Sequence, residues 1–211
     1  MALAEQRATE ESLALWGQKP GERPRFNYRW EHLRAVHRLC LRLGRRLGAD
    51  PEVLEAAVWL HDVIKTHSRE PSAVPDSERS AEEARRVLRT TDFPAAKLDH
   101  VVEAIRVHEG LFRDEPIRQL EAAILWDADK LSKLGATYLV HAFCIRPAFD
   151  PIFQGRPTDT DLALRSTEEW VGMAERIVAS MNTEPGRIEG ARRLAFLRRF
   201  VRELRGEWEK K

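Results

Sequence analysis

The sequence predicts an all-α fold, a helical bundle in a single domain over residues 1–211. Apolar residues recur at spacings of three and four along several segments, which is the period of a helix face that packs on a core. Helix-start signals such as Asp50-Pro51 separate these segments. No stretch shows a convincing period of two, the pattern of half-buried strands. At 211 residues the chain is long enough to bury a core without disulfides.

Composition narrows the classes of partner. A net charge of +1 provides no overall field toward nucleic acid or an anionic membrane, so neither is expected as a partner. No apolar run approaches the roughly 20 residues of a membrane span, and the N-terminus lacks a signal-peptide core. Cys40 and Cys144 lie in apolar segments, which predicts two buried, reduced thiols in a cytoplasmic protein. Nothing in the sequence indicates an oligomeric state.

The first third of the chain is predicted to hold a helix over 3–16, a proline-containing loop over 18–27 and an amphipathic helix over about 28–48. The stripe of that last helix is Trp30, Leu33, Val36, Cys40, Leu43 and Leu47. At about 100° per residue, His32 lies about 50° from the stripe's centre and His37 about 90° from it. His32 is therefore expected to face inward, either as a ligand or as a hydrogen-bonded histidine at the core's edge. His37 is expected at the boundary.

The next helix, from Pro51 to about residue 65, is apolar on nearly every face and is predicted to be the buried central one. It delivers His61 and Asp62 at its C-terminal end. Burying both groups among apolar side chains costs on the order of several kcal/mol unless something compensates. A divalent cation compensates, because it prefers a neutral imidazole nitrogen and an ionised carboxylate oxygen, and the helix C-terminus favours positive charge. The alternative is a His-Asp pair that only caps the helix.

The middle of the chain is predicted to contain an exposed loop over 66–77, a helix over 78–90, and a helix that starts at Asp92-Phe93-Pro94 and runs to about residue 108. His100 lies about 150° from the apolar stripe of this last helix and is expected to face solvent. His108 lies about 70° from the stripe. His108 is expected either to line a cleft or to cap the helix end.

A turn precedes Pro116, which is predicted to open a helix with two aspartates in an apolar stretch. Asp127 and Asp129 are two residues apart, so their side chains point about 200° from each other. Only one of them can comfortably bind a given ion. The helical wheel alone favours Asp127.

The C-terminal third is predicted to begin with a long surface loop over 147–165. Ser166-Thr167-Glu168-Glu169 reads as a capping box that opens a helix to about residue 182. Pro185-Gly186 is expected to break that helix, and a final arginine-rich helix covers about 187–209. Its arginines indicate either a phosphate or RNA patch or a solvated face, and the glutamates among them favour the solvated face.

Taken together, the potential ligands form a recognisable set: His32, then His61-Asp62, then an aspartate 65 to 67 residues further on. This order resembles the HD phosphohydrolase superfamily, whose signature is His…His-Asp…Asp. The likeness extends to the surrounding segments Trp30-Glu31-His32-Leu33-Arg34-Ala35-Val36, Ala56–Lys65, Ile105-Arg106-Val107-His108 and Asp127-Ala128-Asp129-Lys130-Leu131, the last two resembling motifs of a bacterial subgroup of stand-alone HD hydrolases. It covers about residues 26–150, and helices over about 166–209 are expected to pack on this core.

The resemblance implies that His32, His61, Asp62 and Asp129 bind one divalent ion. The family pattern has Ala-Asp before the leucine of the last motif, which selects Asp129 against the helical wheel. Asp127 is then a supporting residue that orients a ligand histidine. The mixed nitrogen and oxygen ligands leave the metal open among Mn²⁺, Mg²⁺, Fe²⁺, Co²⁺, Ni²⁺ and Zn²⁺.

The implied activity is that of a metal-dependent phosphohydrolase. It would cleave a phosphate ester or anhydride of a small molecule, with a nucleotide as the expected substrate, by a metal-activated water. Asp62 would orient that water, and Lys65 would neutralise phosphate charge. His108 would contact phosphate or protonate the leaving group. Some similar HD hydrolases carry a glutamate where this chain has Lys65, which argues against a carboxylate base at that position.

Two alternatives remain at this level. The first is a catalytically silent nucleotide-binding or regulatory HD domain, which the four filled ligand positions disfavour. The second, a di-metal oxygenase on the same scaffold, would need extra histidine ligands, for which His67 and His108 are the obvious candidates. The sequence has no phosphate-binding P-loop and no His-Glu-x-x-His motif, and it lacks the Gly-Tyr-Pro motif of relatives that cleave cyclic dinucleotides.

Overall fold

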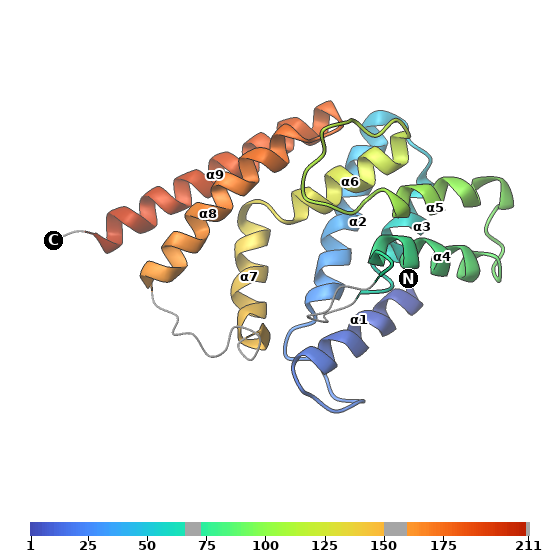
Figure 1. Cartoon of the computed structure of the whole chain (residues 1–211), viewed down its shortest axis with the longest axis horizontal. Coiled ribbons are helices and arrows are strands. Elements are labelled where there is room, and N and C mark those ends of the chain that lie inside the picture. The colour runs from blue at the N-terminus through green and yellow to red at the C-terminus, as the bar shows by residue number, and fades with distance from the viewer. Residues whose placement is uncertain (66–72, 150–159, 210–211) are drawn as a thin grey trace.

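The computed structural model describes residues 1–65, 73–149 and 160–209, and this part of the chain is all-helical, as predicted (Figure 1). In chain order the helices are α1 (Ala2–Leu15), α2 (Tyr28–Leu47), α3 (Pro51–Leu60), α4 (Asp76–Leu88), the short 3₁₀ helix η1 (Ala95–Lys97), α5 (Leu98–Arg106), α6 (Leu120–Ser132), α7 (Gly135–Phe149), α8 (Thr160–Ala179) and α9 (Glu184–Trp208). Among the described helices, none combines the length and the apolar character that crossing a membrane requires.

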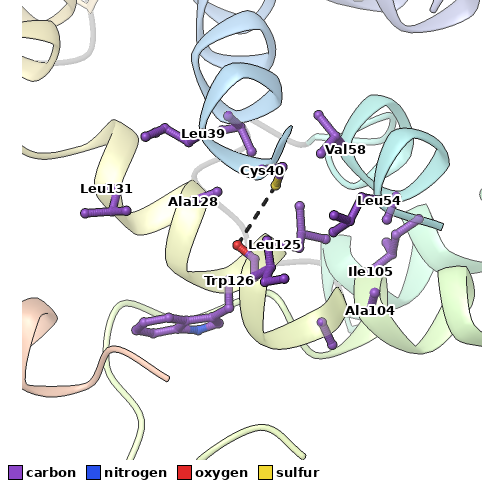
Figure 2. Close-up of a cluster of buried hydrophobic side chains, with 14 of the residues drawn as sticks. Leu39, Cys40, Leu54, Val58, Ala104, Ile105, Leu125, Trp126, Ala128 and Leu131 are labelled. Atoms are coloured by element: carbon purple, nitrogen blue, oxygen red, sulfur yellow. Dashed lines mark hydrogen bonds between the residues drawn. The ribbon is translucent and has the colours of Figure 1, made fainter. Parts of the chain in front are cut away.

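The core lies where α2, α3, α5 and α6 pack against one another. Helix α6 is its centre, because every side chain from Ala122 to Ser132 is buried. Figure 2 shows the packing, with the Cys40 thiol of α2 donating to the Ile124 carbonyl of α6 at 3.9 Å. Such close packing fixes the helix axes, and it therefore fixes the side chains that the helices carry at their ends.

Helix α1 docks near the N-terminal end of α2, and Asn27 is the link between them. Its Oδ1 caps α2 by accepting from the Trp30 amide at 3.1 Å, and it also accepts from the Ser12 hydroxyl at 2.9 Å. Its Nδ2 donates to the Thr9 hydroxyl at 3.0 Å. Because one side chain makes all three bonds, the position of α1 is coupled to the start of α2.

Helices α8 and α9 run side by side as an extended pair (Figure 1). Trp170 of α8 stacks on Tyr138 of α7, with ring centroids 4.7 Å apart, and its indole N–H donates to the Lys133 carbonyl at 3.1 Å. Thr183 caps α9 by accepting from the Gly186 amide at 3.0 Å. The contacts of Trp170 attach the pair to α7 and to the end of α6.

The boundaries of two central helices differ from the prediction. Helix α3 ends at Leu60 and not near residue 65, so His61 and Asp62 follow the helix. The imidazole of His61 makes a 2.8 Å bond to the Val58 carbonyl, which a continuing helix would use for a backbone amide. The helix expected after Pro116 starts only at Leu120.

The predicted capping box is wrong. Residues 166–169 lie inside α8, which already begins at Thr160, and the buried Leu164 extends its apolar face toward the N-terminus. Pro185-Gly186 was expected to break a helix but instead lies in the first turn of α9, where the missing amide of proline costs no hydrogen bond.

The predicted loop over 147–165 is largely helical at its two ends. Helix α7, which the sequence pattern did not predict, continues through Pro147 to Phe149, and α8 begins at Thr160. Residues 150–159 lie outside the described part of the chain. Both cysteines are free, and Cys40 is buried as expected, but Cys144 is exposed on α7. Helix α7 packs mainly on α6 and α9, so an apolar sequence there does not guarantee burial.

Candidate metal centre

Three helices bring the four predicted ligands together. His32 lies in the second turn of α2, His61 and Asp62 follow α3, and Asp129 lies near the end of α6; all four side chains are buried. Nε2 of His32 lies 3.1 Å from Oδ1 of Asp129. Oδ2 of Asp62 lies 3.7 Å from Nε2 of His32 and 3.7 Å from Nε2 of His61. The donor atoms of two imidazoles and two carboxylates therefore lie close together inside the protein.

The outer nitrogens of two of the histidines fix their tautomers. Nδ1 of His61 lies 2.8 Å from the Val58 carbonyl, and Nδ1 of His108 lies 2.5 Å from the Ile105 carbonyl. A carbonyl can only accept, so the proton of each ring is on Nδ1. Nε2 of His61 therefore presents a lone pair to the interior of the site, which is the form that a metal ion binds.

Two histidine Nε2 atoms of the site lack hydrogen-bond partners among the described residues, which is unusual for buried polar atoms. Nε2 of His32 and Nε2 of His61 are buried, and neither has a hydrogen-bond partner within the described residues; the 3.1 Å approach of Asp129 to His32 lacks hydrogen-bond geometry. Burial lowers the pKa of His32 to about 4 and that of His61 to about 3, so both rings are neutral near pH 7. Buried acceptors without a donor are costly, and a cation would satisfy both.

The spacing of these atoms fits a divalent cation. Ligand atoms about 2.1 Å from an ion, at tetrahedral to octahedral angles, lie roughly 3.0–3.4 Å apart. The observed separations of 3.1 and 3.7 Å are close to this range. The ligand atoms of His32, His61 and Asp129 lie within 4.8 Å of one another, and so do those of His61, Asp62 and His108. A neutral nitrogen and carboxylate donor set suits a borderline divalent ion.

The two oxygens of Asp62 have different surroundings. Oδ2 faces the two histidine nitrogens and accepts from Nη1 of Arg29. Oδ1 lies 3.6 Å from Nε2 of His108 and 3.7 Å from Nζ of Lys65. Burial alone would raise the pKa of Asp62, but the Arg29 guanidinium and the other hydrogen-bonding and positive groups around the carboxylate together hold that pKa well below its usual value. One oxygen is thus placed to bind a cation while the other faces the pocket.

Asp129 is held by two lysines of its own helix. Lys130 contacts Oδ2 and donates to the His108 carbonyl at 2.7 Å, and Lys133 contacts Oδ1. Burial would raise the pKa of Asp129, but the two ammonium groups outweigh it and keep the carboxyl ionised. Burial also lowers the pKa of Lys130 to about 8.

A cavity of about 310 Å³ opens beside the cluster. Four cationic side chains line it, together with His32, His108 and three carboxylates. The lining residues are Tyr28, Arg29, His32, Asp62, Lys65, His108, Glu109, Gly110, Leu111, Asp129, Lys130 and Lys133. Lys65 and His108, both predicted from the sequence as substrate-binding, lie in this wall.

Asp127 is placed elsewhere, and its predicted role of orienting a ligand histidine is wrong. Its Oδ1 accepts from the amide and side chain of Asn182, at 2.8 and 3.1 Å. Its Oδ2 accepts from the amide and hydroxyl of Thr183, at 2.8 and 2.7 Å. Asp127 therefore joins α6 to the connection between α8 and α9. The wheel argument for Asp127 fails because every face of α6 is buried, so burial does not distinguish the two aspartates.

The sequence reasoning missed three cationic residues of the pocket: Arg29, Lys130 and Lys133. Lys130 carried a signal, because a lysine inside so apolar a helix needs a buried partner. Nothing near Arg29 in the sequence predicted its role, since its second partner, Glu11, lies in α1. Oε2 of Glu11 is 3.1 Å from Nε of Arg29. His67, a possible further ligand, lies outside the described residues.

The fold and the cluster define the class first: an all-α protein with a buried cluster of histidines and aspartates where three helices meet. The HD domain family model matches residues 29–134, half of the chain, and the chain belongs to this family. No curated protein matches the sequence significantly.

Solved structures with the same fold are distant in sequence. YpgQ from Bacillus subtilis, crystallised in complex with ADP, is 22% identical, with a TM-score of 0.63 and 98% of each chain covered. An HD-superfamily hydrolase from Bacillus thuringiensis is 20% identical, with a TM-score of 0.64 and coverage of 99% of this chain and 97% of that one. A predicted HD-superfamily hydrolase from an uncultured Thermotogales bacterium is 20% identical, with a TM-score of 0.63 and coverage of 98% and 90%.

Proposed function

We propose that this protein is a metal-dependent phosphohydrolase that cleaves a phosphate ester or anhydride of a small molecule, with a nucleotide as the preferred substrate. One observation carries the proposal. Two buried imidazole nitrogens without hydrogen-bond partners in the described part of the chain, those of His32 and His61, lie with two carboxylates beside a cavity whose lining includes four cationic side chains. The first feature suits a divalent cation and the second suits a phosphate group.

His32, His61, Asp62 and Asp129 would hold the ion. When bound, a divalent ion supplies hydroxide near neutral pH and polarises a phosphoryl oxygen. Asp62 is suited to orient the attacking water, because its Oδ1 faces the cavity while Arg29 and the ligand site engage its Oδ2. Mn²⁺, Mg²⁺, Fe²⁺, Co²⁺, Ni²⁺ and Zn²⁺ all remain candidates for the ion.

Lys65 and His108 act on the substrate side. The ammonium group of Lys65 lies 3.7 Å from Asp62 Oδ1, at the cavity wall, where it would balance the charge that develops on the phosphoryl oxygens. Nδ1 of His108 is engaged with the Ile105 carbonyl, which leaves Nε2 to exchange a proton with a leaving oxygen.

The preference for a nucleotide draws on the similar fold of YpgQ, which was crystallised with ADP. A catalytically silent nucleotide-binding domain is the second candidate, because the same cavity would also bind a nucleotide without turnover. The two candidates differ in one measurable property, which is metal-dependent release of phosphate or pyrophosphate.

The test uses the full chain, stripped of metal with a chelator and reloaded separately with each of the six ions. Nucleoside mono-, di- and triphosphates and a chromogenic phosphodiester are offered as substrates. We expect turnover that appears with metal and is lost in His61→Ala. Nucleotide binding in a calorimeter without turnover under any metal would support the silent domain and contradict the hydrolase.

A further inference from the structure

His32 differs from the other two histidines of the site in how its outer nitrogen is bonded. His61 and His108 follow helix ends, and each ring bonds the carbonyl three residues earlier through Nδ1. His32 lies in the second turn of α2, where the helix itself uses the neighbouring carbonyls. Its Nδ1 contacts instead the hydroxyl of Ser132, the last residue of α6, at 3.1 Å.

We propose that Ser132 is a positioning residue that keeps the His32 proton on Nδ1 and so leaves the Nε2 lone pair for the cation. Ser132 has one hydroxyl proton. The Ser132 oxygen lies 2.6 Å from the Asp129 carbonyl, which can only accept, so the proton goes to that carbonyl. The serine oxygen is then an acceptor toward His32, and the ring must supply the proton from Nδ1. The proposal rests on the cation-binding part of the proposed function.

The opposite arrangement would place the proton of His32 on Nε2 and direct it at Asp129. That arrangement requires Ser132 to donate across the longer contact of 3.1 Å and to leave the 2.6 Å contact to the carbonyl without a proton. It also requires a hydrogen bond from Nε2 to Asp129, whereas the 3.1 Å approach lacks hydrogen-bond geometry. Both observations favour the Nδ1 proton.

As a consequence, the end of α6 positions two predicted ligands, Asp129 and His32. Asp129 is one ligand, and its own carbonyl orients the Ser132 hydroxyl that holds the other, His32. Ser132 is 3% exposed, so water does not readily replace the hydroxyl. Loss of such an outer hydrogen bond typically costs about 10–100-fold in metal affinity.

The first measurement is nitrogen-15 NMR of the histidine rings in the chelated wild-type chain at pH 7.5. We expect the proton of His32 on Nδ1, as for His61, which is bonded to a backbone carbonyl and serves as the internal reference. In Ser132→Ala, His32 should shift toward the Nε2–H form while His61 remains unchanged. A wild-type His32 that carries its proton on Nε2 overturns the proposal, and this reading requires neither metal nor turnover.

The second measurement is titration of the chelated protein with Mn²⁺ and Zn²⁺. Ser132→Ala should bind each ion about 10–100-fold more weakly than wild type. Ser180→Ala is the matched control, because the Ser180 hydroxyl also donates to a carbonyl and accepts from an N–H group, those of Arg176 and Arg113. Equal affinity of Ser132→Ala and wild type, or an equal loss in both variants, overturns the proposal. A protein that binds metal as expected but hydrolyses nothing leaves it standing and contradicts only the proposed hydrolysis.

Discussion

At the scale of single residues, Asp62 and Asp129 look alike in the sequence, but each is paired with a different kind of cation in the structure. Asp62 and Asp129 are both buried carboxylates held ionised by cations, but Asp62 is neutralised by Arg29 from α2 and Asp129 by two lysines of its own helix. Burying either carboxylate without its cation would cost on the order of several kcal/mol. The cations therefore stabilise the ligands in the form that binds metal.

Lys65→Ala is expected to lower kcat/KM on phosphate substrates by about 10–100-fold, since one charge-assisted contact to phosphate is worth roughly 1.5–3 kcal/mol. Metal content should not change, because Lys65 lies beside Oδ1 of Asp62, whereas Oδ2 faces Nε2 of His32 and of His61. Steady-state kinetics and elemental analysis are measured together, with the exposed Lys19→Ala as control. Loss of metal in Lys65→Ala would show that the lysine supports the ligand cluster and not the substrate.

Asp129→Ala and Asp127→Ala should fail in different ways. Asp129→Ala removes a predicted ligand, so metal affinity and turnover should be lost even at a temperature where the variant is folded. Asp127→Ala leaves the buried donors of Asn182 and Thr183 unpaired and should lower the free energy of unfolding by about 2–4 kcal/mol.

Urea unfolding and Mn²⁺ titration at a temperature where both variants are folded compare the two aspartates. Saturating metal should restore activity in Asp127→Ala and not in Asp129→Ala. The reverse ranking would mean that the ligand is Asp127.

At the scale of elements, the pocket depends on a helix outside the residues that match the family. Helix α1 contributes Glu11, whose carboxylate oxygens lie 3.1 and 3.2 Å from Nε and Nη2 of Arg29. Arg29 in turn contacts Asp62, so the docking of α1 reaches the ligands through one buried guanidinium. Helix α6 also links two parts of the molecule. Its Asp129 lines the cavity, and its Asp127 bonds the connection between α8 and α9.

The packing of α9 against α6 gives a test at this scale. A Cβ on Gly186 would lie 2.3 Å from Oδ2 of Asp127 and 2.8 Å from the Thr183 hydroxyl, so Gly186→Ala must disturb that junction. We expect a loss of about 1–3 kcal/mol in unfolding free energy. Gly172→Ala in α8 is the control, because nothing lies within 4 Å of its Cβ position and alanine favours a helix. Equal stability of the two variants in urea would contradict the close contact between α9 and α6.

At the scale of the whole molecule, the buried histidines make the metal-free protein sensitive to acid. The folded-state pKa is lowered from 6.5 to about 4 for His32 and to about 3 for His61, both chiefly by burial. Between those values and 6.5 the unfolded chain binds protons that the folded chain does not, so stability falls as pH falls. The contribution is complete above pH 6.5. Burial also lowers the pKa of His141, which acts in the same direction.

We therefore expect the unfolding free energy of the chelated protein to decrease from pH 6.5 to pH 4, by at most about 1.4 kcal/mol per pH unit for each histidine. Urea denaturation at pH 7.5, 5.5 and 4.5 measures the slope, and His32→Asn should reduce it. A stability that is constant or rises toward pH 4.5 would show that these rings are already protonated in the folded state.

The sequence by itself determined the fold class and predicted the residues that the structure brings together in the buried cluster. Helical periodicity predicted the amphipathic helix that carries an inward-facing His32, and the Asp50-Pro51 signal marked the start of α3, where Asp50 accepts from the Glu52 amide at 2.9 Å. Both features depend on residues that are close together in the sequence, so local sequence patterns predict them. The resemblance added Asp129, which the helical wheel had ranked second.

Only the tertiary structure decided the roles of Asp127, Arg29 and Ser132. The partners of these residues lie far away in the chain: Asn182 and Thr183 for Asp127, Asp62 and Glu11 for Arg29, and His32 for Ser132. Hydrogen bonds between helices distant in sequence leave no period in the local pattern, because packing alone brings their donors and acceptors together.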